Sequence, residues 1–478
     1  MKEHQEGITV KKDKDFSEWY SQVIQKAELA DYSKVSGCIV FRPRAYYIWE
    51  TVQNCMNEEF KKLKIKNAYF PLFIPESLFK KEAEHVKGFN PEVAWVTHAG
   101  DSKLNEKLAI RPTSETIIYD HYSKWIHSWK DLPLKLNQWS NIVRWEFKHP
   151  IPFIRTREFL WQEGHNVFAT EKEDEEDTLL MLEIYEKTLK ELYAIPVLKG
   201  KKSEKEKFAG ALYTLSLETL FPNGKAIQCC TSHNLGQNFS KAFDITFLDK
   251  NEKKQYAWQN SWGFTTRTIG ILIGLHGDDN GLIIPPKLAE IQIVIIPIIF
   301  DKTKEKVLKK ANEIEKSLKN YRVYLDDNED YSPGWKFNEY ELKGVPIRIE
   351  IGPRDLEKNQ VILVRRDVLK KENVKIKDLN KKIEKTLEEI HENLYNKAKK
   401  FLFDNIVEIK SINELKKIVN SGKIAKVNWC LETKCEKIIK DKSEGAKNLN
   451  ISLTEKAKGN CFNCSNKANG VAYFAKSY

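Results

Sequence analysis

The sequence lacks the long apolar runs of a membrane protein. Its longest apolar stretch, Ile293–Phe300, contains Pro297 and is far shorter than the roughly 20 residues that a helix needs to cross a bilayer. The N-terminal segment Met1–Phe16 is polar and has no apolar run followed by small residues, as a signal peptide would have. We therefore expect a cytoplasmic protein without a membrane partner.

Cysteine is also scarce, with 8 residues in a chain of 478. Cys38, Cys55, Cys229 and Cys230 are either scattered or adjacent, which excludes the regular spacing of a disulfide framework. The other cysteines lie in two close pairs near the C-terminus.

Acidic residues are outnumbered by basic ones, 68 against 79, which gives a net charge of +11. An excess of positive charge suits a polyanionic partner such as a nucleic acid, although a highly charged surface without a specific partner explains it equally well. The length predicts about three domains, each able to bury its own core.

Charged and aromatic residues are densest in Asn141–His165 (NIVRWEFKHPIPFIRTREFLWQEGH). Its two halves, Ile142–Phe147 and Phe153–Trp161, alternate apolar and charged residues around a turn at His149 and Pro150. This alternation predicts two antiparallel strands with their charges on one surface. The alternative is an exposed hairpin held by salt bridges.

The charges in this hairpin suit a nucleotide site. Arg144 and Arg155 can hold phosphate oxygens in fork geometry, while Glu146 and Glu158 can hold a metal ion or a hydroxyl group.

A second polar group follows a predicted strand in Leu108–Thr116 (LAIRPTSET). The strand ends at Pro112, and Thr113 and Ser114 then start a helix. A capping box opened by Thr113 needs Glu or Gln three residues later, but Thr116 stands there. Binding of a ligand and simple N-capping are therefore both open.

Two longer helices carry start signals. Thr170–Tyr193 opens with a capping box between Thr170 and Glu173, and Ser36–Gln53 begins as a strand that passes through Pro43 into a helix.

Ala226–Phe239 (AIQCCTSHNLGQNF) is predicted to place Thr231 and His233 on one face of a strand. Gln228 is out of phase with them unless a bulge intervenes. His233 on its own is also compatible with a purely structural histidine.

A Gly-spaced helix in Asn260–Pro286 carries Arg267 near its start. The glycines permit close packing, and an arginine beside a helix start makes an anion site plausible.

In this order, the segments resemble the three motifs of class II aminoacyl-tRNA synthetases: Pro43 between a strand and a long helix, Arg144-Trp-Glu with a loop and Arg155, and a Gly-rich segment with Arg267. Several longer motifs together resemble prolyl-tRNA synthetases of the archaeal and eukaryotic type, and they are AIRPTSET (Ala109–Thr116), RWEFKHPIPFIRTREFLWQEGH (Arg144–His165), KFAG (Lys207–Gly210), TSHNLGQNF (Thr231–Phe239) and NSWGFTTR (Asn260–Arg267). The resemblance covers essentially the whole chain.

The resemblance implies an α/β (α+β) protein in which an antiparallel class II sheet, flanked by helices, binds ATP and L-proline. Proline would be activated to prolyl-adenylate and transferred to the 3′ end of tRNA(Pro), with Mg²⁺ assisting. A homodimer is implied, with the segment around Pro43 near the interface. A catalytically silent RNA-binding relative and a synthetase for another amino acid, such as threonine, are the alternatives.

The family pattern also implies roles for individual residues. The catalytic arginines are Arg144, Arg155 and Arg267. The proline-binding residues are Thr113, Glu115, Arg144, Trp161, Glu163, His165, Phe208 and His233. The ATP-binding residues are Arg144, Glu146, Arg155, Thr156, Gln228, Thr231, Thr265 and Arg267, of which Glu146 and Gln228 lie on the magnesium side.

The sequence departs from the family pattern at two places. Cys229 and Cys230 stand where small residues such as glycine are expected, and Leu212 stands where an acidic residue is common. No large insertion lies between Arg157 and Arg267, where bacterial-type relatives carry a hydrolytic editing domain.

Three domains are expected, with a catalytic domain at 1–286, an α/β anticodon-binding domain at 287–400 and a small zinc-binding domain at 401–478. Candidates for contact with anticodon bases are Arg348, Glu350, Arg354 and Arg366, although internal salt bridges explain the same residues.

The C-terminal segment holds Cys430-x4-Cys435 and Cys461-x2-Cys464. Four thiolates in two close pairs suit a structural, tetrahedral Zn²⁺ site, whereas scattered buried cysteines are the alternative. The aromatic end of the chain further suggests, by resemblance to the family, that the Tyr478 carboxylate reaches the catalytic cleft.

Overall fold

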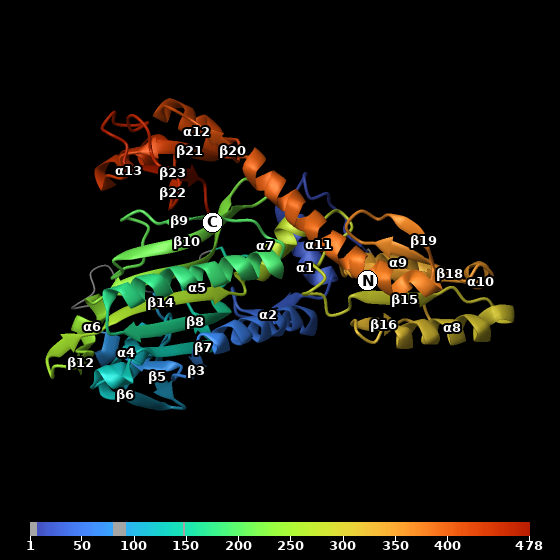
Figure 1. Cartoon of the computed structure of the whole chain (residues 1–478), viewed down its shortest axis with the longest axis horizontal. Helices are drawn as coiled ribbons and strands as arrows, with labels where there is room; N and C mark the ends of the chain where they lie inside the picture. Colours follow the sequence, from blue (N-terminus) through green and yellow to red (C-terminus); the bar gives the residue numbers. More distant parts are fainter. Residues whose placement is uncertain (1–6, 80–91, 147–148) are drawn as a thin grey trace.

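The structure, a computed structural model, describes residues 7–79, 92–146 and 149–478. Its centre is one large sheet, with the strand order β20-β21-β23-β22-β9-β10-β11-β14-β8-β7-β3 (Figure 1). The strands of this sheet are β3 (Lys66–Asn67), β7 (Leu134–Val143), β8 (Glu158–Phe168), β9 (Leu198–Lys201), β10 (Tyr213–Leu220), β11 (Ala226–Gly236), β14 (Trp258–Thr265), β20 (Ile406–Glu408), β21 (Ile424–Trp429), β22 (Lys447–Ser452) and β23 (Gly470–Ala475).

The long helix α5 (Glu171–Glu191) covers one face of the central antiparallel strands and contacts β8, β10, β11 and β14 (Figure 1). It begins as predicted, because the Thr170 side chain accepts from the Glu173 N–H and the Glu173 carboxylate accepts from the Thr170 N–H. This reciprocal capping fixes where the helix starts relative to the sheet.

Three further helices pack beside α5 in the largest hydrophobic core. They are α1 (Phe16–Lys26), α2 (Pro43–Lys62) and α7 (Arg267–His276), and they bury Trp19 and Trp49. As predicted, α2 has a proline at its first turn, directly after a short strand, where the missing N–H costs no hydrogen bond.

The predicted hairpin is present, but its strand bounds were wrong. β7 and β8 pair antiparallel from Leu134↔Val167 to Val143↔Glu158, so the strands extend further from the turn than the predicted halves. The described part of 144–157 is irregular, and Phe153 has a φ of 62°. Pro150 and Pro152 explain this, because each lacks the N–H that a strand would use. Phe147 and Lys148 lie outside the described residues.

A bulge interrupts the pairing of β10 with β11. Leu217 pairs with Cys230 and Glu218 with Gln228, so Cys229 is the extra residue. The bulge moves Gln228 into phase with Thr231 and His233, which confirms the condition set by the sequence.

The second unit is an α/β layer whose five-stranded sheet has the order β16-β15-β17-β18-β19, as the strand and helix pattern predicted. β16, β15 and β17 are parallel. Its elements are β15 (Ile293–Pro297), α8 (Lys304–Ser317), β16 (Val323–Leu325), α9 (Pro333–Leu342), β17 (Ile347–Ile351), α10 (Pro353–Glu357), β18 (Gln360–Arg365), β19 (Lys371–Lys375) and α11 (Leu379–Asp404). Helix α11 then runs to the C-terminal unit (Figure 1).

The C-terminal unit adds α12 (Ile412–Asn420) and α13 (Thr433–Lys442), and its strands continue the central sheet. The junction is β22 with β9, where Ser452 pairs with Gly200. A Cβ on Gly200 would lie 2.5 Å from the Ile451 carbonyl oxygen, so only glycine allows the strands to meet this closely.

Smaller elements complete the described chain. They are β1 (Ala30–Tyr32) with β2 (Ile39–Phe41), β4 (Phe73–Pro75), β5 (Trp95–Ala99) and β6 (Ser102–Ile110), α4 (Glu115–Trp125), α6 (Asn238–Phe243), β12 (Thr246–Leu248) with β13 (Lys254–Tyr256), and the short 3-10 helices at Trp129–Asp131, Asp301–Thr303 and Ile376–Asp378. Among the described helices, none combines the length and the apolar character that crossing a membrane requires.

Candidate active site and metal centre

A cavity of about 250 Å³ lies on the face of the central sheet opposite α5. Odd-numbered residues of β8 line it together with Thr231 and His233, which follow the bulge in β11. The even-numbered Ser232 and Asn234 bond instead to α5, as alternation along a strand requires. The cavity brings together most of the predicted site residues. They are Thr113, Glu115, Arg144, Thr156, Trp161, Glu163, His165, Phe208, Gln228, Thr231, His233, Thr265 and Arg267.

Two half-buried arginines, Arg144 and Arg267, form the cationic part of the cavity. Arg144 Nε donates to the Pro112 carbonyl at 3.0 Å, and Arg267 Nε donates to the Ile154 carbonyl at 3.0 Å. Burial lowers the pKa of both arginines, and the charges of Arg144 and Arg155 lower the pKa of Arg267 further. Because arginine nevertheless stays protonated, the arrangement favours an anionic ligand.

Carboxylates form the anionic part of the cavity. Glu163 accepts from Gln138 Nε2 at 2.8 Å and from the Ser114 hydroxyl, and it bonds to His165 Nε2 at 3.0 Å. His165 Nδ1 bonds in turn to the Tyr119 hydroxyl at 3.0 Å. Every one of these side chains is buried, so the network holds a fixed shape beside the cavity.

Helix α4 starts inside this network rather than with a capping bond. Ser114 occupies the N-cap position without a side-chain cap bond, because its hydroxyl donates to Glu163. The Thr113 hydroxyl donates to Glu115 Oε2. Of the two alternatives for Thr113 and Ser114, simple N-capping is therefore wrong.

His233 is held on both ring nitrogens. Nδ1 bonds to Thr214 Oγ1 at 2.9 Å and Nε2 to Thr231 Oγ1 at 3.0 Å, and the Phe208 ring lies 4.8 Å away, centroid to centroid. Burial, assisted by the charges of His165 and Arg144, lowers the pKa of His233 to about 3. The ring is therefore neutral near pH 7 and acts by shape and hydrogen bonding.

Three predicted residues do not line the cavity. Glu146 and Arg155 are exposed, although their charges act on the pKa values of Arg144 and Arg267. Tyr478 packs its ring against Phe221 at 5.6 Å, and its N–H donates to the Ala226 carbonyl at 3.1 Å. The chain end thus lies at the start of β11, two residues before Gln228.

Other lining residues were not predicted. They are Phe153, Ile154, Phe159, Glu206, Thr214, Cys229, Cys230, Ser261, Trp262 and Gly263. The strand period offered a signal for some of them, since Phe159 shares a face with Trp161, and both rings lie under Arg144 at 5.7 and 5.8 Å. Ile154 and Glu206 lie in loops, for which no periodic signal exists.

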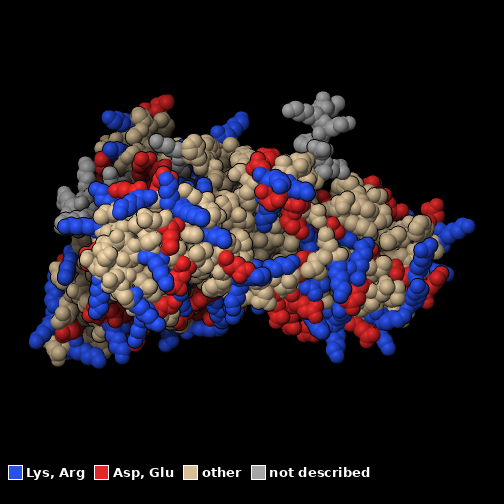
Figure 2. All heavy atoms as spheres, turned by 90° about the horizontal axis from the view of Figure 1, so that it is seen from above, with Lys and Arg blue, Asp and Glu red and all other residues tan. Residues whose placement is uncertain are grey.

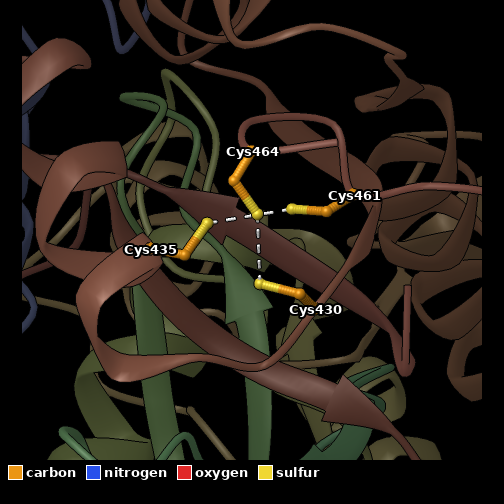
Figure 3. A group of neighbouring side chains, drawn as sticks. All are labelled: Cys430, Cys435, Cys461 and Cys464. Carbon is orange, nitrogen blue, oxygen red and sulfur yellow. Dashed lines mark hydrogen bonds between the residues drawn. The ribbon is translucent and has the colours of Figure 1, made fainter. Parts of the chain in front are cut away.

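The four C-terminal cysteines converge from the end of β21, from α13 and from a turn (Figure 3). Their sulfur atoms all lie within 4.8 Å of one another, and the Cys435–Cys461 and Cys430–Cys464 pairs are separated by 3.8 and 3.6 Å. Sulfurs bound tetrahedrally to Zn²⁺ at about 2.3 Å would be roughly 3.8 Å apart. The donor set therefore fits zinc, and the alternative of scattered cysteines is wrong.

Most of the residues predicted to contact the anticodon form ion pairs within the protein instead. Arg348 Nη2 lies 3.0 Å from Glu350, and Arg366 donates to both oxygens of Asp278 at 2.6 and 2.8 Å. Arg348, Glu350 and Arg366 are buried, and only Arg354 of the four is exposed. The geometry favours the internal salt-bridge alternative for the three buried side chains.

Comparison with known proteins agrees with this architecture. Residues 95–276 match the family model "tRNA synthetase class II core domain (G, H, P, S and T)". Residues 292–386 match "Anticodon binding domain", and residues 412–478 match "Prolyl-tRNA synthetase, C-terminal". Fold and cavity together define a class II aminoacyl-tRNA synthetase.

Individual relatives specify the kind of synthetase further. The chain is 50% identical to the proline–tRNA ligase of Natranaerobius thermophilus, over 97% of this chain and 96% of that protein, and 48% identical to proline–tRNA ligase 2 of Bacillus thuringiensis, over the full length of both. The crystal structure of prolyl-tRNA synthetase from Cryptosporidium parvum, complexed with halofuginone and AMPPNP, matches with a TM-score of 0.95 at 47% identity and 99% coverage of both chains. The chain belongs to the prolyl-tRNA synthetase family.

Proposed function

We propose that the chain activates L-proline with ATP to form prolyl-adenylate and then transfers the prolyl group to the 3′ end of tRNA(Pro). One observation carries this proposal: a single cavity joins two half-buried arginines to a buried carboxylate network and a neutral histidine. Such a cavity suits a ligand that carries both phosphate and ammonium charges.

The proposed roles follow from the charges. Arg144 binds the α-phosphate and the proline carboxylate, and Arg267 with Arg155 binds ATP, because attack at phosphorus needs charge neutralisation more than a proton-transferring base. Glu115 faces the ring ammonium. Trp161, Glu163, His165, Phe208 and His233 shape the proline end.

Magnesium would be held on the ATP side by Glu146 and Gln228, where it would neutralise phosphate charge. Glu146 is exposed, so its carboxylate is accessible to a magnesium ion that arrives together with ATP. Mg²⁺ titration of the exchange reaction, in the wild type and in Glu146→Ala, would test this role.

Zinc is proposed as a structural ion of the four-cysteine centre. All four positions are filled by protein sulfur, as in structural rather than catalytic sites. Freshly purified protein should contain about one zinc per chain, and Cys464→Ser should lower this content and destabilise the C-terminal unit. Metal analysis without zinc would contradict the assignment.

We propose further features of the chain. The archaeal and eukaryotic type is supported by full-length similarity to the Cryptosporidium enzyme and by the absence of a large insertion between Arg157 and Arg267. We also propose a homodimer, a cytoplasmic location, anticodon contact through Arg354, and domain boundaries near residues 286 and 400. Basic and acidic side chains are interspersed on the face in Figure 2, so tRNA contact should depend on individual side chains.

We also propose that the Tyr478 carboxylate lies close to the cleft. Packing of this residue beside the start of β11 supports it. Deleting Tyr478 should depress exchange without changing zinc content; full activity of the shortened chain would refute the role.

Proline-dependent exchange between ATP and pyrophosphate tests the proposed function. A panel that includes threonine and alanine separates a prolyl enzyme from a synthetase for another amino acid. A catalytically silent RNA-binding relative would show no exchange with any amino acid. Charging of tRNA(Pro) by the same preparation completes the test.

A further inference from the structure

A buried hydrogen bond links the four-cysteine unit to the catalytic cavity. Ser203 Oγ donates to Glu436 Oε1 at 2.8 Å, across 233 residues of sequence, and both residues are buried. Glu436 directly follows Cys435 in α13. Burying a carboxyl group costs free energy unless it is hydrogen-bonded. The Ser203 hydroxyl supplies such a bond to Glu436, so the contact offsets part of the cost of burying this side chain.

On the catalytic side, Ser203 organises the loop of residues 202–212, which joins β9 to β10 and is called the cavity loop below. Ser203 Oγ also accepts from the Glu206 N–H at 3.3 Å, and the Ser203 carbonyl accepts from the Lys207 N–H at 2.9 Å. The serine therefore closes the turn with which the loop begins.

The same loop delivers two side chains to the cavity. Glu206 and Phe208 both line it, and the Phe208 N–H donates to Thr214 Oγ1, which also bonds to His233. The Phe208 ring lies against the His233 ring. A shift of the loop would therefore change the shape of the cavity at its histidine end.

We propose that Glu436 is a positioning residue that holds the cavity loop through Ser203, so that Phe208 and Glu206 complete the proline end of the cavity. The metal centre acts on the same loop by fixing α13, to which Cys435 and Glu436 belong. The assignment of this end to proline rests on the proposed function; the coupling of the two units does not.

Glu436→Ala removes the acceptor and tests the link. Its matched control is Asp441→Ala, which removes an exposed carboxylate from the same helix, and Glu436→Gln retains an acceptor oxygen. Two readouts apply to full-length protein of measured zinc content. One is native tryptic cleavage at the cavity loop and its approach, which carry Lys201, Lys202, Lys205 and Lys207. The other is the split between KM for proline and kcat in exchange.

For Glu436→Ala we expect wild-type zinc content, loop cleavage about tenfold faster and KM for proline about tenfold higher, as loss of one buried hydrogen bond implies. The kcat and the KM for ATP should change little. Glu436→Gln should restore most of the wild-type behaviour, and Asp441→Ala should match the wild type.

Unchanged cleavage and KM in Glu436→Ala would overturn the proposal, as would a Glu436→Gln variant no better than the alanine variant. If Glu436→Ala loses zinc or unfolds, Ser203→Ala decides, because it breaks the same bond from the catalytic side. That variant should show faster cleavage with full zinc content; wild-type cleavage would again overturn the link. If the wild type shows no proline-dependent exchange, the proposed function fails, whereas the cleavage comparison still decides the coupling.

Discussion

The two faces of the central sheet use polar residues in opposite ways. On the face that lines the cavity, Arg144, His165 and His233 surround open space. On the other face, Asn166 and Asn260 both donate to Asp177 Oδ2, at 2.7 and 3.1 Å. The same strands thus present a ligand site on one side and an internal polar lock on the other.

The lock is aligned with the site. Asn234, Asn260 and Asn166 are direct neighbours across β11, β14 and β8, and the adjacent row is His233, Ser261 and His165. A slip by one residue would turn every side chain to the wrong face. The buried asparagine row, which donates to α5, therefore specifies the register of the row beside it. The geometry of the cavity is therefore fixed by hydrogen bonds on the opposite, α5 face of the sheet.

The largest expected effect comes from removing the hydrogen bonds on the α5 face of the sheet, called the back face below. Asp177→Ala would remove the carboxylate that Lys135 contacts at 2.6 Å. It would also remove the acceptor that the buried Asn166 and Asn260 share. Removal of one partner of a largely buried ion pair should lower the free energy of unfolding by about 3 kcal/mol. Chemical denaturation measures this change.

Glu176→Ala is the control for that variant, because Glu176 is an exposed carboxylate on the same helix and its pairing with Lys172 is solvent-exposed. It should change stability by less than about 0.5 kcal/mol. Equal free energies of unfolding for the two variants would show that the hydrogen bonds to Asp177 do not stabilise the sheet.

Breaking the cavity face should leave stability nearly unchanged but remove activity. Arg144→Ala should lower proline-dependent exchange about 100–1000-fold, since it removes a donor aimed at developing charge. Its denaturation curve should stay close to that of the wild type. Near-normal exchange would remove Arg144 from the site, and marked unfolding would erase the contrast between the faces.

Local signals in the sequence predicted many parts of this arrangement. The capping box at Thr170, the proline that starts α2, the shared face of Thr231 and His233, and the spacing of the four cysteines each depend on residues close in the chain. Period and capping chemistry are short-range properties, so a single sequence carries them.

Long-range pairings could not be predicted in the same way. The joining of β22 to β9 brings Ser452 to Gly200, and Arg366 finds Asp278 in another unit. Neither pairing is marked by a local sequence pattern. For this reason the C-terminal unit was expected as a separate domain, and Arg366 was a candidate for contact with anticodon bases. The Ser203–Glu436 bond escaped sequence reasoning for the same reason.

The smallest expected effect, taken over a single pH unit, concerns the titration of Asp174 on the α5 face. Asp174 is buried against the back face, where Asn234 Nδ2 donates to it at 2.8 Å, and burial together with the charge of Asp177 raises the pKa of Asp174 from 3.8 to about 8. Between these values the folded protein keeps a proton that the unfolded chain releases. The stabilisation is therefore complete below about pH 4 and is lost as the pH rises towards 8.

Asp174→Asn should abolish this dependence, because the amide keeps an acceptor for Asn234 and does not titrate. Between pH 6 and 7 the wild type should lose about 1 kcal/mol of unfolding free energy relative to the variant. Denaturation of both proteins across pH 5–9 measures the difference. His233, on the cavity face, does not titrate in this window because its pKa is about 3. Parallel curves for the two proteins would mean that Asp174 is ionised in the folded protein, which would contradict the prediction.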